Sequence, residues 1–113
     1  MSISLDLHVL DTLANHDAAK IRKYALLFIQ SMDDILAQID VAIDSKDIAQ
    51  LGAMGHRAKS TALNIGASDF SQHCMLLEQA AHDQDSSTAL AIAQTLRPLF
   101  GPVHAAITRH IAS

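Results

Sequence analysis

The feature that most constrains the fold is the spacing of apolar side chains, which recur at every third or fourth position through most of the chain. Between residues 17 and 44 the repeating positions are Ile21, Tyr24, Phe28, Met32, Ile35, Ile39 and Ala42. Because an α-helix has about 3.6 residues per turn, this spacing predicts one long helix with a single buried stripe. The chain also has 3 Val and 4% aromatic residues, too few of the residues that typically fill strands. An all-α fold is therefore predicted.

The same pattern divides the rest of the chain into further helices. We predict a short helix over residues 4–14 and longer ones over 17–44, 48–65, 69–83 and 88–111, separated by polar or glycine-containing turns. Asp17 and Asp47 are placed to cap the helices that follow them, Asp47 together with Gln50. The last helix is expected to be interrupted at Gly101 and Pro102, since proline lacks an N–H group. Short connections favour an antiparallel four-helix bundle with a short additional N-terminal helix, in which residues 1–113 form one domain.

Charge and cysteine content narrow the classes of function. The net charge of −4 lacks the basic excess that nucleic acid or an anionic membrane would attract, so we expect neither as a partner. The single cysteine, Cys74, cannot form an internal disulfide, and the first thirteen residues contain no basic residue of the kind that begins a signal peptide. These features predict a cytoplasmic protein with a protein or small-molecule partner.

The predicted helix over residues 48–65 carries the residues of greatest chemical interest. At 100° per residue, its apolar stripe separates from an outward arc that contains Ala49, Gly52, His56, Lys59, Ser60 and Leu63. On this arc Gly52 and Ser60 stand one turn on either side of His56 and would leave its ring accessible, while Lys59 would place an ammonium beside it. Ala49 and Leu63 would add a small apolar docking patch. Gly55 lies on the core stripe, where a glycine would also allow a neighbouring helix to approach closely.

The stretch His56-Arg57-Ala58-Lys59-Ser60, followed by Gly66-Ala67, Phe70, Cys74 and Leu77-Glu78, resembles the histidine-containing phosphotransfer (HPt) domain of bacterial multistep phosphorelays. That family has a phosphorylatable His, a Lys three residues later, a Gly that closes the helix, and a Cys and a Leu-Glu pair on the next helix. Ser60, Phe70 and Gly55 depart from the more usual Gly, aliphatic residue and Ala. These changes affect size and packing and leave the phosphotransfer pattern in place.

The resemblance implies that His56 accepts a phosphoryl group from an aspartate of one receiver domain and passes it to an aspartate of another. Lys59 would offset phosphoryl charge, and Glu78 would accept the Nδ1–H of the imidazole so that Nε2 is free to attack. The chain would have no cofactor of its own, and Mg²⁺ would be supplied by the partner receiver domain. The implied partners are receiver domains of a hybrid histidine kinase and a response regulator, served by a monomeric phosphocarrier without autonomous kinase activity.

Other interpretations of the same residues remain open at this stage. The principal alternative is a non-phosphorylated module of the same fold that only docks to receivers, in which Lys59 and the small neighbours of His56 would be unnecessary. A glutamate late in a surface helix, such as Glu78, is as often solvated as it is functional. The 7 histidines do not favour a metal centre, because none stand three or four apart on a helix. Cys74 is expected to be a core residue.

Overall fold

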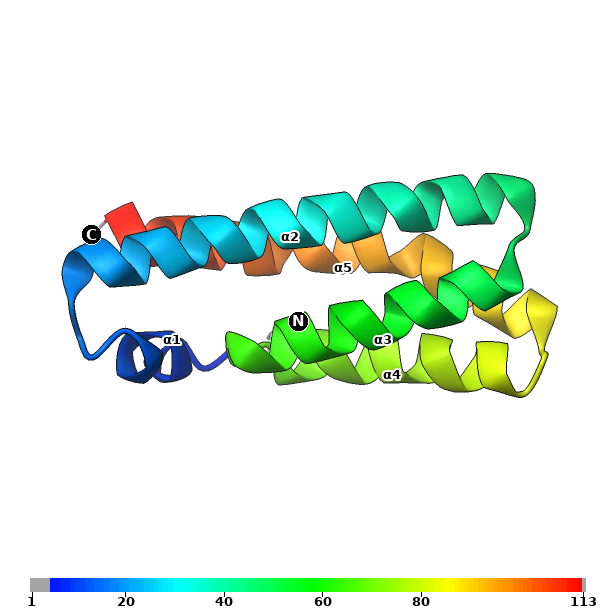
Figure 1. Cartoon of the computed structure of the whole chain (residues 1–113), viewed down its shortest axis with the longest axis horizontal. Coiled ribbons are helices and arrows are strands. Elements are labelled where there is room, and N and C mark those ends of the chain that lie inside the picture. The colour runs from blue at the N-terminus through cyan, green and yellow to red at the C-terminus, as the bar shows by residue number, and fades with distance from the viewer. Residues whose placement is uncertain (1–4, 113) are drawn as a thin grey trace.

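The computed structural model describes residues 5–112, and every regular element in that range is an α-helix (Figure 1). The helices are α1 (His8–Leu13), α2 (Ala18–Ser45), α3 (Ile48–Asn64), α4 (Ser68–His82) and α5 (Ser86–Ala112). Helices α2 to α5 alternate in direction and form an antiparallel four-helix bundle, which α1 precedes (Figure 1). The predicted fold is therefore confirmed, although residue 4 of the predicted first helix lies outside the described residues.

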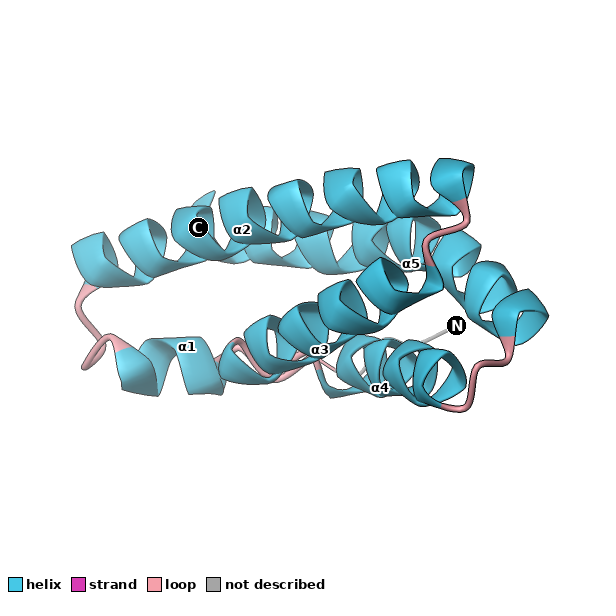
Figure 2. Ribbon diagram, turned by 45° about the vertical axis from the view of Figure 1, so that its right-hand side comes forward, coloured by secondary structure: helices cyan, strands magenta, loops and turns pink. Residues whose placement is uncertain are grey.

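The bundle consists of two helix pairs of unequal length. Helices α2 and α5 are the long pair and α3 and α4 the short pair, and α1 lies at the end of the bundle where α3 stops (Figures 1 and 2). The 28 residues of α2 rise about 42 Å, which accounts for the 43 Å length of the molecule. Two contacts hold the N-terminal segment in place: Asp6 N donates to Gly66 O at 2.9 Å, and His110 Nε2 lies 2.8 Å from Asp11 Oδ1.

Short side chains at the helix boundaries set where two of the helices begin. Asp17 accepts a hydrogen bond from Lys20 N, and Asp47 accepts one from Gln50 N, each at 3.1 Å, as predicted. The side chain of Gln50 does not complete the capping box, because its Nε2 contacts Gln38 Oε1. Helix α4 begins one residue earlier than predicted, and its N-cap residue forms no side-chain cap hydrogen bond.

Helix α5 continues through Pro98 and Pro102, so the predicted interruption at Gly101 and Pro102 is wrong. Each proline removes the N–H that would bond to the carbonyl four residues earlier. Both prolines and Gln94 are exposed, so the freed carbonyls of Gln94 and Pro98 lie on the solvent side, where water can bond to them. Gly101 also has no Cβ to collide with the ring of Pro102.

The core joins all four long helices through their buried stripes. Phe28, Phe70 and Phe100 come from α2, α4 and α5, and their ring centroids lie 5.9 Å (Phe28–Phe100) and 5.6 Å (Phe70–Phe100) apart. Cys74 is fully buried beside them on α4, and burial raises the pKa of its thiol to about 12. Phe70 is thus a core residue, and so is Cys74, as the sequence predicted. Across residues 5–112, no helix has the length and apolar character that a membrane span requires.

Candidate functional site

Helices α3 and α4 approach each other closely at two glycines of α3. A Cβ at Gly52 would lie 2.9 Å from Ala81 Cβ, and one at Gly55 would lie 3.1 Å from Cys74 O and 3.2 Å from Glu78 N. The close helix approach expected at Gly55 is present. Gly52, expected from the sequence to keep the imidazole accessible, also packs against α4, where a helical glycine removes a clash between two helices.

The imidazole of His56 points out of the bundle, as the helical geometry predicted, with 60% of its side chain exposed. Its Nδ1 lies 2.7 Å from Oε2 of Glu78, a residue of α4 that is 22 positions later in the chain. A carboxylate can only accept a hydrogen bond, so the neutral ring carries its proton on Nδ1 and donates it to Glu78. The lone pair of the imidazole is then on Nε2.

Glu78 binds a second partner through its other carboxylate oxygen. Lys59 Nζ donates to Oε1 at 2.6 Å, and the two side chains are 26% and 31% exposed. The hydrogen bond from Lys59 is the main cause that lowers the pKa of the Glu78 carboxyl. Burial is the next largest effect and opposes it, and the hydrogen bond from His56 lowers the pKa further. The three side chains therefore form a continuous cluster, Lys59–Glu78–His56, around one ionised carboxylate.

Glu78 has a compositional signal that the sequence interpretation left unused. Of the 12 acidic residues in the chain, it is the single glutamate. The side chain of glutamate is one methylene longer than that of aspartate, and here it spans the gap between two helices to reach both His56 and Lys59. The length of this side chain is part of what completes the cluster.

The remaining residues of the predicted outward arc surround the cluster on α3. Ala49 and Ser60 are exposed, and Leu63 has 54% of its area exposed. Ala49, His56 and Leu63 are seven residues apart and so share one face of the helix. On the adjoining helix α4, Met75 is also about half exposed. The structure therefore places small and apolar side chains around His56 on an accessible face.

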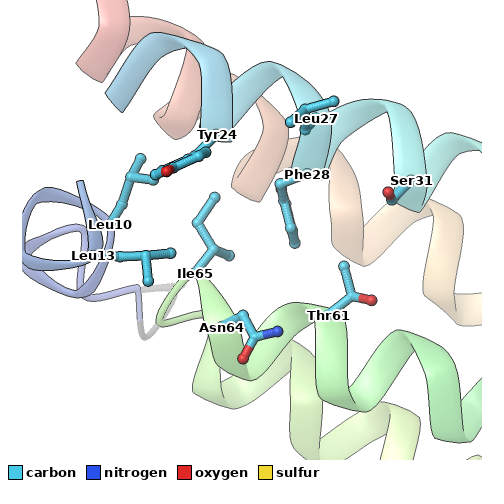
Figure 3. A pocket seen from close by; sticks show the side chains of 9 residues that line it. All are labelled: Leu10, Leu13, Tyr24, Leu27, Phe28, Ser31, Thr61, Asn64 and Ile65. Carbon is cyan, nitrogen blue, oxygen red and sulfur yellow. The ribbon is translucent and has the colours of Figure 1, made fainter. Parts of the chain in front are cut away.

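A hollow between α1, α2 and the end of α3 lies apart from this cluster (Figure 3). It has a volume of about 250 Å³ and is lined by Leu10, Leu13, Tyr24, Leu27, Phe28, Ser31, Thr61, Asn64 and Ile65. None of the site residues predicted from the sequence lines it. Within residues 5–112, no three His, Cys, Asp or Glu side chains come together in a group that could hold a metal ion. The cluster of Lys59, Glu78 and His56 thus lies on the surface of α3 and α4 and not in this hollow.

The sequence interpretation missed Ser71 of α4. This residue is 4% exposed, and its Oγ donates to the main-chain carbonyl of Lys59 across the helix interface at 3.2 Å. The available signal in the sequence was the position of this serine. It stands three residues before Cys74 and seven before Glu78, on the side of α4 that faces α3.

Known proteins resemble this chain in sequence and in fold. A family model described as the Hpt domain matches residues 23–105, a range that contains His56, Lys59 and Glu78. Among solved structures, histidine-containing phosphotransfer protein B (HptB) from Pseudomonas aeruginosa PAO1 superposes with a TM-score of 0.89 at 20% sequence identity, over 99% of this chain and 97% of that chain. At 20% identity, this superposition shows that the two proteins share a fold. No curated protein matches the sequence.

Proposed function

This chain belongs to the Hpt family, and from that premise we propose that it relays a phosphoryl group between aspartates of receiver domains through phospho-His56. The observation that carries the proposal is the exposed imidazole whose Nδ1 is held by Glu78, 2.7 Å away. This contact favours the one tautomer that presents a nucleophilic nitrogen to a partner.

The transfer step follows from that tautomer. The Nε2 lone pair attacks the phosphorus of a receiver aspartyl phosphate, an N–P bond forms, and the P–O bond to the aspartate breaks to release its carboxylate. The proton on Nδ1 stays where it is, so the ring becomes a phosphoimidazolium. Its positive charge lies against the Glu78 carboxylate, which already accepts the Nδ1–H bond. Attack by the aspartate of a second receiver reverses these changes and frees His56.

Lys59 supports the same reaction electrostatically. Its ammonium is 2.6 Å from Glu78 and stands one helical turn from His56, where it can offset negative charge on the phosphoryl oxygens. The Mg²⁺ that would neutralise charge on the aspartyl side belongs, in this proposal, to the receiver domain. The chain itself supplies the nucleophile, its orientation and one positive charge.

The direct test uses purified chain and phosphorylated receiver domains. We expect acid-labile label on the wild-type chain and none on His56→Gln, which should keep the helical circular dichroism of the wild type. His73→Gln is the matched control, because the ring of His73 is half-buried and bonds to the Asp69 carbonyl of its own helix. Label that persists on another histidine of His56→Gln would contradict the assignment. Receiver binding without label on wild type would favour the non-phosphorylated docking module.

A further inference from the structure

We propose that Ser71 is a positioning residue for His56. Its buried hydroxyl holds α4 in one axial register against α3 and so keeps Glu78 between His56 and Lys59. The consequence for phosphoryl transfer rests on the function proposed above, whereas the consequence for the imidazole tautomer does not.

The environment of Ser71 supports a role in specifying the register. Ser71 is the one buried polar side chain among residues 5–112, and its hydrogen bond joins α4 to the Lys59 carbonyl of α3. A buried hydroxyl costs free energy unless it is bonded, and an alanine would occupy the same place without that requirement. Burial of apolar side chains is non-directional, whereas this hydrogen bond has a required distance and angle. Selecting one helix alignment is the best-attested use of a buried polar residue.

Lys59 links the register contact to the functional cluster. Its main-chain carbonyl accepts from Ser71, and its ammonium donates to Glu78. Ser71 and Glu78 are seven residues apart on α4, so they lie on the same side of the helix and are separated by about 10 Å along its axis. The hydrogen bond from Ser71 that fixes the register of α4 is therefore accepted by Lys59, the same residue that Glu78 has to reach.

The cluster is sensitive to register because both Glu78 oxygens are used. One contact is 2.7 Å long and the other 2.6 Å, and they run to residues almost one turn apart on α3. If α4 slid along α3, the carboxylate would approach one partner only by leaving the other. Gly55 complements Ser71 by setting the spacing of the two helices, since Glu78 N lies only 3.2 Å from the place of an added Cβ.

The experiment compares Ser71→Ala with Ser45→Ala in the unphosphorylated chain. Ser45 also donates its hydroxyl to a helix carbonyl, that of Val41 at 3.0 Å, but both residues are in α2. The ¹⁵N resonances of the His56 ring report the tautomer, and Glu78→Ala supplies the spectrum of a ring without its acceptor. All spectra are recorded below the melting range of the least stable variant.

We expect Ser71→Ala to move the His56 resonances from the wild-type position towards those of Glu78→Ala, while Ser45→Ala leaves them unchanged. Phosphoryl transfer by Ser71→Ala should fall about tenfold, since misplacement of a reacting group by about 1 Å can cost up to about a hundredfold. A wild-type tautomer in Ser71→Ala would overturn the proposal, even if that variant were less stable. A shifted tautomer in a chain that never accepts phosphate would retain the positioning role and refute the proposed function.

Discussion

At the scale of single residues, the contact that His56 makes through Nδ1 decides which ring nitrogen keeps its lone pair. Glu78 holds Nδ1 through one oxygen and Lys59 through the other, so a single carboxylate orients the imidazole and positions a positive charge. The two partners of Glu78 differ in what they contribute. His56 would carry the phosphoryl group, and Lys59 would offset the negative charge of the phosphoryl oxygens. Substitutions at Lys59 and Glu78 should therefore have separable effects.

Replacement of Lys59 by alanine is expected to slow transfer with little effect on folding. A partly exposed ion pair stabilises a fold by about 0–1 kcal/mol, so the melting temperature should stay within about 5 °C of wild type. Loss of one charge-assisted hydrogen bond, worth about 1.5–3 kcal/mol, should slow phosphorylation about tenfold to a hundredfold. Thermal melts and transfer kinetics check these two expectations. Lys20→Ala, at an exposed position of α2, is the control. Equal losses of receiver binding and transfer would instead make Lys59 a docking residue.

The titration of Glu78 should depend on Lys59, the main cause of its lowered pKa. Because Glu78 is the single glutamate, selective ¹³C labelling of glutamate isolates its carboxyl resonance. We expect a midpoint below the ordinary 4.5 in wild type and a higher midpoint in Lys59→Ala. Identical midpoints in the two proteins would contradict the assigned cause.

The same shift predicts how stability depends on pH. The unfolded carboxyl takes up its proton at about pH 4.5 as the pH falls, before the folded one does. The stabilisation from ionised Glu78 is therefore fully present above that pH and is lost as the pH falls through the lower folded pKa. The melting-temperature difference between wild type and Glu78→Gln should shrink as the pH falls below about 4.5.

At the scale of helices, the turn between α3 and α4 has the strictest steric requirement. Gly66 has a φ of +80°, a conformation that costs a residue with a Cβ about 1–2 kcal/mol. An added Cβ would also lie 2.2 Å from the carbonyl oxygen of Asp6, which precedes α1. This one position thus joins the α3–α4 turn to the N-terminal segment.

Replacement of Gly66 by alanine should destabilise the protein by at least about 2 kcal/mol and lower the melting temperature by about 8 °C or more. Gly66→Asn separates the two causes, because asparagine tolerates positive φ but retains a Cβ. We expect this variant to be destabilised as well, as measured by thermal and denaturant unfolding. Wild-type stability of Gly66→Asn would show that the contact with Asp6 is unimportant.

At the scale of the whole molecule, α5 lies diagonally opposite α3 in the bundle (Figure 1), and the side chain of His56 is exposed on α3. The apolar residues near this face, Leu63 and Met75, are about half exposed and form a modest surface. A relay protein has to release each partner, which favours a small, transient interface over a large, permanent one. We therefore expect a monomer that binds receivers with a micromolar dissociation constant, equivalent to about −8 kcal/mol.

Bulky substitutions on opposite sides of the bundle test this docking face. Ser60→Phe should weaken receiver binding at least about tenfold and block transfer, because it covers the exposed surface one turn from His56. Ala91→Phe, at an exposed position of α5, is the matched control and should bind and transfer normally. Titration calorimetry and sedimentation measure binding and oligomeric state. Wild-type transfer by Ser60→Phe, or an obligate dimer that covers His56, would contradict the predicted docking mode.

The sequence alone determined the features that depend on a single helix. Apolar spacing located the long helices, and 100° per residue placed His56 outside and Cys74 inside. Asp17 and Asp47 marked two helix starts because a cap bonds within three residues of itself. The passage of α5 through Pro98 and Pro102 was not predictable from the local rule, because it depends on which side of that helix faces solvent in the bundle.

Only the tertiary structure decided how one helix faces another. A periodic pattern fixes which residues share a face, but it leaves free the rotation and axial shift between two packed helices. The contact of His56 with Glu78, the second contact of Glu78 with Lys59, and the packing of Gly52 against Ala81 all depend on those two quantities. Close backbone approach and the hydrogen bond from Ser71 determine both of them across an interface that no local stretch of sequence contains.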